Sequence, residues 1–220
     1  MEAASVPYAG LTAYSAISCF GGVNEGNAFN KTVLVLGGTG GVGLLAIQIL
    51  KSWGAIVTAT CNKNAVEWLK QESGADRVID YDSNELSKLT DSFDLVINAA
   101  SGNKRIIEGT RECLRKGLES KYVTVTSPLL SNYDKKGYIC GTIQTFKDLS
   151  CDTINGIKDR RQIRWAYFIP NGLALNHIRR LVEEGRIRPV VQNTIDFNDA
   201  RTGYMKVMDG HARGKTVIKI

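Results

Sequence analysis

Residues 32–43 have the sequence TVLVLGGTGGVG, and this stretch decides the fold of the chain. Its first five residues are β-branched or aliphatic, which is typical of a buried strand. The strand stops at a cluster of five glycines, and residues 41–53 are then apolar on almost every side. We therefore expect a strand, a tight turn and a buried helix in this order.

Three glycines of this stretch, Gly38, Gly40 and Gly43, have the spacing G-x-G-x-x-G. In this pattern one glycine permits the turn, one lets the backbone approach a pyrophosphate, and one lets the helix pack closely on the strand. The phosphates would lie on free N–H groups at the helix N-terminus, where the helix dipole favours negative charge. Glycine-rich turns also end ordinary strands, so a plain structural turn is the alternative. The strand before and the helix after the glycines favour dinucleotide binding.

Strands and helices alternate along the first two thirds of the chain. A helix is expected at residues 5–20, where apolar residues recur at helical spacing. The strands expected after residues 32–36 are residues 55–60, 77–81, 93–99 and 121–126, and the helices between them are residues 65–72, 84–90 and 104–114. Alternation of this kind predicts an α/β fold with a doubly wound parallel sheet, the Rossmann fold, whose ligands gather at the carboxyl ends of the strands.

The remainder of the chain departs from this alternation. Residues 127–150 have the character of a loop, and residues 152–168 and 171–184 that of two helices. The last segments expected are strands at residues 187–191, 195–197 and 215–220, and a helix at residues 199–208. We therefore divide the chain into a bridging helix and linker at residues 1–30, a dinucleotide-binding domain at residues 31–186, and a return segment at residues 187–220.

Composition excludes several classes of function. The net charge of +6 comes from scattered Lys and Arg residues with no basic run between aromatic residues, so no nucleic-acid partner is expected. Five cysteines form no C-x-x-C pair, which argues against a disulfide framework or a zinc site and indicates a reducing, intracellular compartment. His177 and His211 are the two histidines, too few and too far apart to predict a metal centre. No membrane span, signal peptide or transit peptide is expected.

The segment after the second strand indicates which dinucleotide is bound. An Asp or Glu about 20 residues past the glycines would hold the ribose 2′-hydroxyl of NAD. Here Asn62 and Lys63 stand at that place, which favours the 2′-phosphate of NADPH, although Lys63 as an ordinary surface lysine is the alternative. Tyr81 follows the third strand and either flanks the adenosine or is simply a half-buried strand aromatic.

Two rival enzyme classes fit less well. A methyltransferase usually holds its ribose with a carboxylate at the end of the second strand, where this chain has none. A short-chain reductase needs a tyrosine and a lysine four residues apart, whereas Tyr133 and Lys136 are three apart.

Several longer motifs resemble one family. GGTGGVG, GADRVIDY at residues 74–81, FDLVIN at residues 93–98 and the tail GRIRPV…HARGKTVIKI resemble the zinc-independent, quinone oxidoreductase-like branch of the medium-chain dehydrogenase/reductases. YVTVTSPLL, RWAYF and GHARGKTVI are similar to a mitochondrial, NADPH-dependent group within it. The resemblance implies NADPH as cofactor, a small-molecule quinone or activated enone as substrate, and a mitochondrial location. It also implies a homo-oligomer or a reticulon-type protein as partner.

The resemblance further implies a domain that this sequence does not contain. In the family, the segment that corresponds to residues 5–17 follows a GroES-like substrate domain, whereas here it follows Met1 almost directly. The N- and C-terminal segments would belong to that largely absent domain. Residues 190–197 would then lack support, or would pair with another chain.

The family's cofactor contacts fall on four parts of this sequence. The residues assigned to the cofactor are Gly38, Thr39, Gly40, Gly41, Val42 and Gly43 in the pyrophosphate loop; Asn62 and Tyr81 at the 2′-phosphate, with Lys63 from its place after the second strand; Ala99, Ala100, Val125, Thr126, Ala166 and Phe168 at the nicotinamide; and His211, Ala212 and Arg213 in the tail. The sequence departs from the family at Asn98 and Ser101, where the family has Asp and Gly, and at Gly38, where alanine is common.

These observations lead to one function and one alternative. The expected reaction is hydride transfer from NADPH to a quinone or an activated enone without zinc, and the cofactor carries the chemistry. No catalytic side chain is identified. The alternative is a catalytically silent NADPH-binding or partner-binding module, because the substrate domain is missing.

Overall fold

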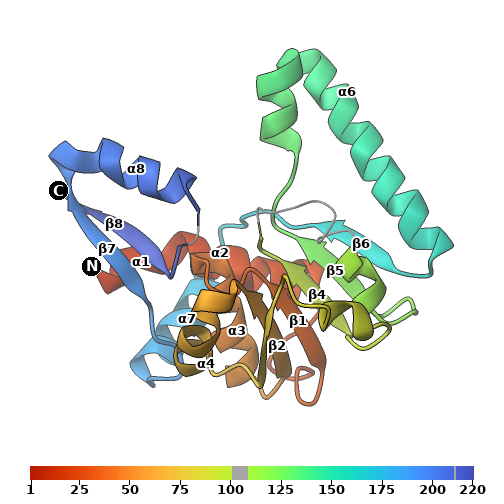
Figure 1. Ribbon diagram of the computed structural model, residues 1–220, viewed down its shortest axis with the longest axis horizontal. Helices are drawn as coiled ribbons and strands as arrows, with labels where there is room; N and C mark the ends of the chain where they lie inside the picture. The colour runs from red at the N-terminus through yellow and green to blue at the C-terminus, as the bar shows by residue number, and fades with distance from the viewer. Residues whose placement is uncertain (101–108, 211) are drawn as a thin grey trace.

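The computed structural model describes residues 1–100, 109–210 and 212–220. Its main feature is a six-stranded sheet of strand order β3-β2-β1-β4-β5-β6, in which every neighbouring pair is parallel (Figure 1). The strands are β1 Thr32–Leu36, β2 Ile56–Cys61, β3 Arg77–Asp80, β4 Leu95–Asn98, β5 Lys121–Thr124 and β6 Gln162–Trp165. The strand order reverses direction beside β1, as in a Rossmann fold. The predicted α/β doubly wound sheet is thus confirmed.

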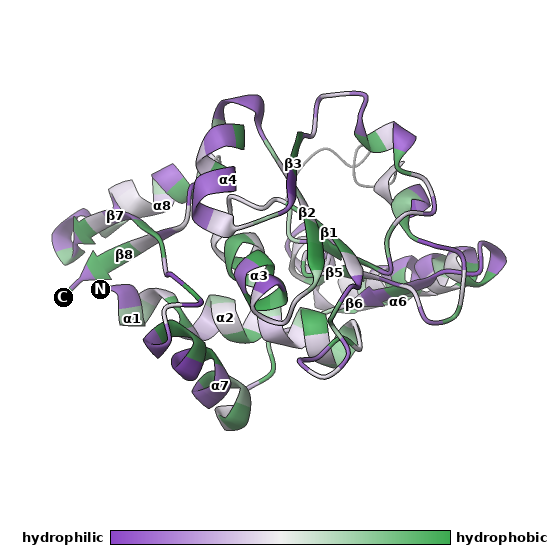
Figure 2. Ribbon diagram, turned by 90° about the horizontal axis from the view of Figure 1, so that it is seen from below, coloured by the Kyte–Doolittle hydropathy of each residue, from purple (hydrophilic) through white to green (hydrophobic). Residues whose placement is uncertain are grey.

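Strand β1 lies at the centre because its side chains are apolar on both faces of the sheet. Val33 and Val35 point into one core and Leu34 and Leu36 into another. The first core is covered by five helical segments: α2 Pro7–Tyr14, η1 Ser15–Phe20, α3 Gly41–Ser52, α4 Val66–Ser73 and α7 Gly172–Glu183. The second is covered by η3 Leu86–Lys88 and η4 Thr110–Cys113. Figure 2 shows the hydrophobic colour of β1 and β2 between these layers.

Helix α3 follows the glycines and is buried along almost its whole length. Gly40 precedes it with extended backbone angles, φ −71° and ψ 157°. A Cβ added to Gly43 would collide with the carbonyl oxygen of Gly37, so only glycine allows the helix to pack this closely on the end of β1. The predicted helix at residues 41–53 is therefore confirmed, and it holds the glycine turn rigidly against the sheet.

Residues 127–168 differ from the prediction. The expected loop at 127–150 is helix α6 Leu129–Lys158, which kinks at Gly137 with φ 73° and ψ 173°. The expected helix at 152–168 ends at Lys158 and is followed by β6, the sixth strand of the sheet. The prediction failed because α6 is apolar on its exposed side, and because β6 is a four-residue edge strand with a single buried residue, Trp165.

The C-terminal segment forms a second, smaller sheet. Strands β7 Val191–Asp196 and β8 Lys215–Lys219 pair in parallel, and η5 Phe197–Asp199 and α8 Ala200–Met208 connect them. The strand expected at residues 187–191 is not formed: residues 187–190 are not in a strand, and β7 begins only at Val191. Residues 191–196, for which the sequence suggested no support or another chain, pair with β8 of the same chain. Figure 1 shows this small sheet beside α1 Glu2–Ser5.

The two helices expected between β3 and β5 are not found as predicted. Of the helix expected at residues 104–114, residues 104–108 lie outside the described part, and Thr110–Cys113 form the 3₁₀ helix η4. The short helix expected at residues 84–90 is the 3₁₀ turn η3. Among the described residues, no helix is long and apolar enough to cross a membrane.

Candidate functional site

The glycine turn joins β1 to α3 at the point where the strand order reverses. Gly37 has the left-handed φ of +75°, one residue before the first glycine of the motif, and a Cβ there would lie 3.0 Å from Cα of Ala100. Gly38 has an ordinary φ, but a Cβ would lie 2.8 Å from Leu69 of α4. The turn predicted at Gly38 is thus made by Gly37, and Gly38 permits packing.

The N-terminus of α3 offers donors for an anion. The amide N–H groups of its first turn, at Gly41, Val42 and Gly43, have no partner within a helix of this kind. A Cβ added to Gly40 would meet only the oxygen of Gly37, at 3.5 Å, so the backbone there is open to a close neighbour. The helix dipole adds partial positive charge at this end. These residues therefore fit a pyrophosphate.

The tail of the chain returns to this turn. The amide of Gly214 donates to the carbonyl oxygen of Thr39 over 2.9 Å, and Gly214 and Gly40 form a parallel bridge. The side chain of Lys215 then lies across Gly41, with Nζ 2.8 Å from the position that a Cβ would occupy. The tail thereby brings a cation to the positive end of α3.

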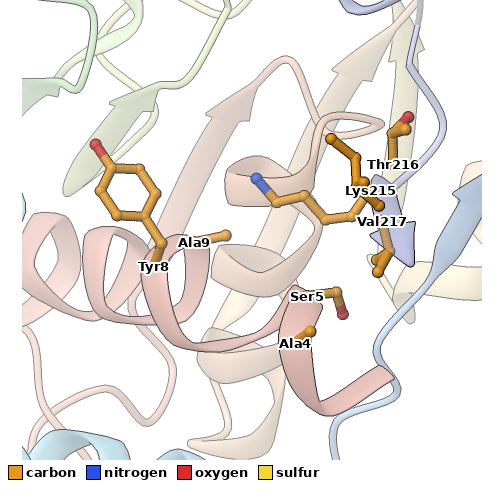
Figure 3. A pocket seen from close by; sticks show the side chains of 8 residues that line it. Ala4, Ser5, Tyr8, Ala9, Lys215, Thr216 and Val217 are labelled. Carbon is orange, nitrogen blue, oxygen red and sulfur yellow. The ribbon is translucent and has the colours of Figure 1, made fainter. Parts of the chain in front are cut away.

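Lys215 is a residue that the sequence reasoning missed. Its side chain is partly buried, and burial lowers the pKa of its ammonium group. Among the described residues no carboxylate pairs with it, and it lines a cavity of about 320 Å³ between the α1–α2 segment and β8. Figure 3 shows its Nζ extending from β8 towards Tyr8. The only signal in the sequence was its place two residues after Arg213 in the returning tail.

An ammonium group at this place is electrostatically unsatisfied. Burial disfavours its charge, and the helix dipole of α3 has the same sign. An anion bound between Lys215 and the amides of Gly41 and Val42 would remove both penalties. The charges around the N-terminus of α3 therefore favour a bound phosphate group.

The end of β2 gathers two residues predicted for a 2′-phosphate, Asn62 and Tyr81, and one predicted for the returning tail, Arg213. Asn62 Nδ2 donates to the hydroxyl of Tyr81 over 3.2 Å. Arg213 Nη2 donates to the carbonyl oxygen of Asn64 over 3.0 Å, and its guanidinium lies 6.0 Å from the ring centre of Trp68. Asn62, Tyr81 and Arg213 thus surround one loop.

Other groups near this loop set its charge. Lys63 begins the exposed turn η2 Lys63–Ala65. Asp80 lies opposite Cys61 in the register of β2 and β3. Burial and the charge of Asp80 raise the pKa of Cys61 to about 11, although Arg213 acts in the opposite direction. The charged groups described at this loop thus include the cations of Lys63 and Arg213 and the carboxylate of Asp80.

The ends of β4, β5 and β6 lie side by side on the other half of the site. Asn98, only 2% exposed, accepts from the amide of Ala100 over 3.1 Å and donates to Oγ1 of Thr124 over 3.3 Å. The amide of Val125 donates to the carbonyl oxygen of Asn98 over 3.0 Å, and that of Ala166 to Thr124 over 2.8 Å. Asn98, a departure from the family, therefore organises the predicted nicotinamide side.

The other residues predicted for the nicotinamide side and the tail are spread over several contacts. Thr126 Oγ1 lies 3.0 Å from Oγ1 of Thr124, and the amide of Ala99 donates to Leu36 over 3.1 Å. Phe168 stacks on Tyr8 with ring centres 4.9 Å apart and 16° between the planes. Ala212 is partly buried next to Arg213. His211 and Ser101 lie outside the described residues.

The same part of the chain contains no evident metal centre. Within residues 1–100, 109–210 and 212–220, no three His, Cys, Asp or Glu side chains gather where they could hold a metal ion.

Comparison with known proteins gives the family. A family model described as zinc-binding dehydrogenase matches residues 73–218. The chain is 40% identical over 222 residues to the mitochondrial NAD(P)H oxidoreductase RTN4IP1 of Danio rerio, covering all of this chain and 57% of that protein. It is also 40% identical to the Homo sapiens protein of the same name, covering 55% of it.

A solved structure agrees with this result. The quinone oxidoreductase from Coxiella burnetii superposes with a TM-score of 0.77 at 26% identity, covering 99% of this chain and 60% of that one. The chain thus spans a little over half the length of the relatives that it matches. With the matched residues, the fold and the glycine turn in agreement, the chain belongs to the zinc-binding dehydrogenase family.

Proposed function

We propose that this chain binds NADPH and belongs to an oxidoreductase that transfers hydride to a quinone or an activated enone without zinc. The observation that carries the proposal is the return of the tail, which brings Arg213 to the loop after β2 and lays Lys215 across Gly41. A bound nicotinamide would supply the hydride. The names of the relatives, NAD(P)H and quinone oxidoreductases, support the same class of reaction.

The choice of NADPH rests on the loop after β2. Asn62 and Tyr81 are joined by a hydrogen bond and can both turn towards a phosphate, and Arg213 adds a fixed cation. The carboxylate of Asp80 stands at the end of β3 rather than on the loop itself. A 2′-phosphate would therefore meet more attraction than repulsion.

The other residues would hold and orient the cofactor. Lys215 and the first amides of α3 would bind the pyrophosphate, and Gly40 would let it approach. Ala100, Val125 and Ala166 end three adjacent strands, so their backbone can present a flat surface to the nicotinamide. Phe168, held by Tyr8, would shield one side of that surface from water. The side chains of Ala100, Val125, Ala166 and Phe168 cannot donate a proton, so the proton would come from solvent or from a further domain.

The second candidate is an NADPH-binding module without activity of its own. The observation in its favour is that the chain spans 57% of the Danio rerio relative, so a substrate domain can lie in the remainder. Quinone-dependent oxidation of NADPH by this chain separates the two. Turnover supports the enzyme; NADPH binding without turnover supports the module; and absence of NADPH binding refutes both.

Location is a further proposal. The relatives are named mitochondrial proteins, and we place this protein in the mitochondrion as well. Fractionation of cells that express the tagged protein would test this, and its absence from mitochondria would contradict it.

A further inference from the structure

Gln48 is the one residue with a polar side chain in residues 41–50 of α3, and it is only 5% exposed. The rest of that segment consists of glycine and aliphatic residues. Burying an amide group costs stability unless its hydrogen bonds are made inside the protein. The hydrogen-bond partners of Gln48 therefore show why a polar residue lies here.

The side-chain amide of Gln48 bonds to two other parts of the chain. Its Nε2 donates to the carbonyl oxygen of Glu72, in the last turn of α4, over 3.0 Å. Nε2 also donates to the carbonyl oxygen of Arg188 over 3.2 Å, and Oε1 accepts from the amide of Arg188 over 3.0 Å. Arg188 lies between α7 and β7, in a segment that forms no strand. Gln48 thus bonds to Arg188 as the backbone of a neighbouring strand would.

An amide is the group that fits these three partners. Its NH₂ group supplies a donor for each carbonyl oxygen, and its oxygen supplies the acceptor for the N–H group of Arg188. A carboxylate has no donor and would face the two carbonyl oxygens. An aliphatic side chain would leave the three backbone groups without this partner, which is unfavourable for buried groups. The contact with the tail therefore accounts for glutamine at position 48.

The segment that Gln48 holds leads directly to the returning tail. Two residues further on, the carbonyl oxygen of Val190 accepts from the amide of Lys215 over 2.9 Å. Gly214 has φ +102°, and a Cβ there would collide with the same carbonyl oxygen of Val190. The amide of Gly214 donates to the carbonyl oxygen of Thr39 over 2.9 Å. A series of backbone contacts therefore runs from Gln48 to the glycine turn.

These contacts connect Gln48 with both cations of the tail. We propose that Gln48 is a positioning residue of the cofactor site. By fixing Arg188 it fixes the tail, and it thereby places Arg213 and Lys215 where they reach the phosphates of NADPH. This inference rests on the proposed function, which assigns those phosphates to the glycine turn and to the loop after β2.

Hydrogen exchange of single amides, measured by NMR on the full chain without nucleotide, tests whether Gln48 holds the tail. In Gln48→Leu we expect the amides of Gly214 and Lys215 to exchange roughly tenfold faster than in the parent, while those of β1 keep their protection. The matched control is Ile49→Val, which removes a buried methyl group from the same helix but no bond to the tail. Its tail amides should exchange as in the parent.

Titration of the same three proteins with NADPH and NADH tests the consequence for the site. Gln48→Leu should bind NADPH roughly tenfold more weakly than the parent and lose most of its preference over NADH, because the tail carries Arg213. Ile49→Val should keep both affinities. A parent that binds neither nucleotide would overturn the proposed function and the cofactor role of Gln48 together, whereas unchanged exchange in Gln48→Leu would overturn the role of Gln48 alone.

Gln48→Glu provides a test that a general loss of stability would not pass. At neutral pH its carboxylate would face the carbonyl oxygens of Glu72 and Arg188 and release the tail. Protonation restores one donor, and burial favours the protonated form. The protection of the Gly214 and Lys215 amides, relative to the parent at the same pH, should therefore increase as the pH is lowered.

Far-ultraviolet circular dichroism would establish that each variant is folded. Four results would overturn the proposal: a folded Gln48→Leu protein with unchanged exchange in the tail, release of the tail without loss of NADPH affinity, an Ile49→Val protein that behaves like Gln48→Leu, or a Gln48→Glu protein whose tail gains no protection in acid.

Discussion

Arg213 and Asn64 are 149 residues apart in the sequence, yet a hydrogen bond of 3.0 Å joins them. This contact carries the guanidinium to the loop where Asn62 meets Tyr81. A surface arginine would be expected to contribute little, but this one is fixed by its own hydrogen bond and lies over Trp68. Its role depends on its position rather than on its charge alone.

Replacement of Arg213 by alanine should weaken NADPH binding far more than NADH binding. A hydrogen bond to a charged group contributes about 1.5–3 kcal/mol, so the dissociation constant for NADPH should rise roughly 10- to 100-fold. NADH lacks the 2′-phosphate and should bind almost as before. Isothermal titration with both nucleotides measures this, with Arg179→Ala on α7 as control. Equal losses for both nucleotides would place Arg213 away from the 2′-phosphate.

Lys215→Met should stabilise the protein without ligand near neutral pH. Methionine keeps the apolar contact with Gly41 but removes a charge that burial disfavours, since the pKa of Lys215 in the folded state is below its ordinary 10.5. The penalty is complete below the folded pKa and disappears as pH rises from that value towards 10.5. The melting temperatures of the two proteins should therefore converge at alkaline pH.

A phosphate ligand should make the parent protein more stable than Lys215→Met. Bound NADPH pairs with Lys215 and should raise the melting temperature of the parent more than that of Lys215→Met. A variant that is less stable than the parent at every pH without ligand would contradict the account.

At the level of the site, the sequence predicted groups of residues better than single contacts. The family resemblance assigned Asn62 and Tyr81 to the 2′-phosphate and Arg213 to the returning tail, and the structure brings all three to one loop. Lys215 was not found, because a lysine at the start of a strand has no local pattern that marks it. Its position becomes evident only when the tail returns over Gly41.

The elements around the glycine turn depend on close packing of α3. Gly43→Ala would place a methyl group against the carbonyl oxygen of Gly37. We expect a loss of about 1–3 kcal/mol in the free energy of unfolding, as for other overpacked sites. Urea denaturation measures it, and Gly172→Ala, where no atom lies within 4 Å, should be nearly neutral. A Gly43→Ala protein as stable as the parent would refute the close approach.

Asp76 joins three elements and gives a second test. It accepts from Lys51 at the end of α3 over 2.7 Å and from the amide of Val57 over 2.7 Å. Burial raises its pKa, but the bonds from Lys51 and Val57 outweigh burial and hold the pKa below 3.8. Its contribution is therefore present above pH 3.8 and is lost as pH falls through the lower folded pKa.

Asp76→Asn should accordingly cost about 1 kcal/mol at neutral pH, since the pair is partly exposed to solvent. The difference from the parent should disappear in strong acid. Denaturation at several pH values would show this, with Glu67→Gln as control because the side chain of Glu67 is 80% exposed. A constant difference at all pH values would mean that Asp76 does not act through its charge.

The first five strands and helices α3 and α4 could be predicted, because strong apolar runs and glycine turns mark them. Helix α6 could not, since its inward residues Gly141, Thr145 and Gly156 are not those of a buried helix face. Strand β6 has only four residues, and the sequence placed them inside a helix predicted at residues 152–168. In both cases the environment in the folded protein, rather than local preference, decides the structure.

In the whole molecule, the six-stranded sheet and the two-stranded β7–β8 sheet meet beside the glycine turn. The six-stranded sheet presents its strand ends from β3 to β6, and the small β7–β8 sheet meets it at Gly40 and Gly214. A dinucleotide lying across the strand ends would contact both sheets, with its adenosine half near β2 and its nicotinamide near β5. Binding should therefore stabilise the contact between the two sheets as well as the turn.

The central claim is that this chain holds NADPH between the glycine turn and its own tail, and paired titrations test it most directly. The quenching of tryptophan fluorescence by NADPH and by NADH gives the two dissociation constants under identical conditions. The account predicts that NADPH binds at least tenfold more tightly than NADH, and that Arg213→Ala removes most of this preference. Equal affinity for the two nucleotides, or no binding of either, would contradict it.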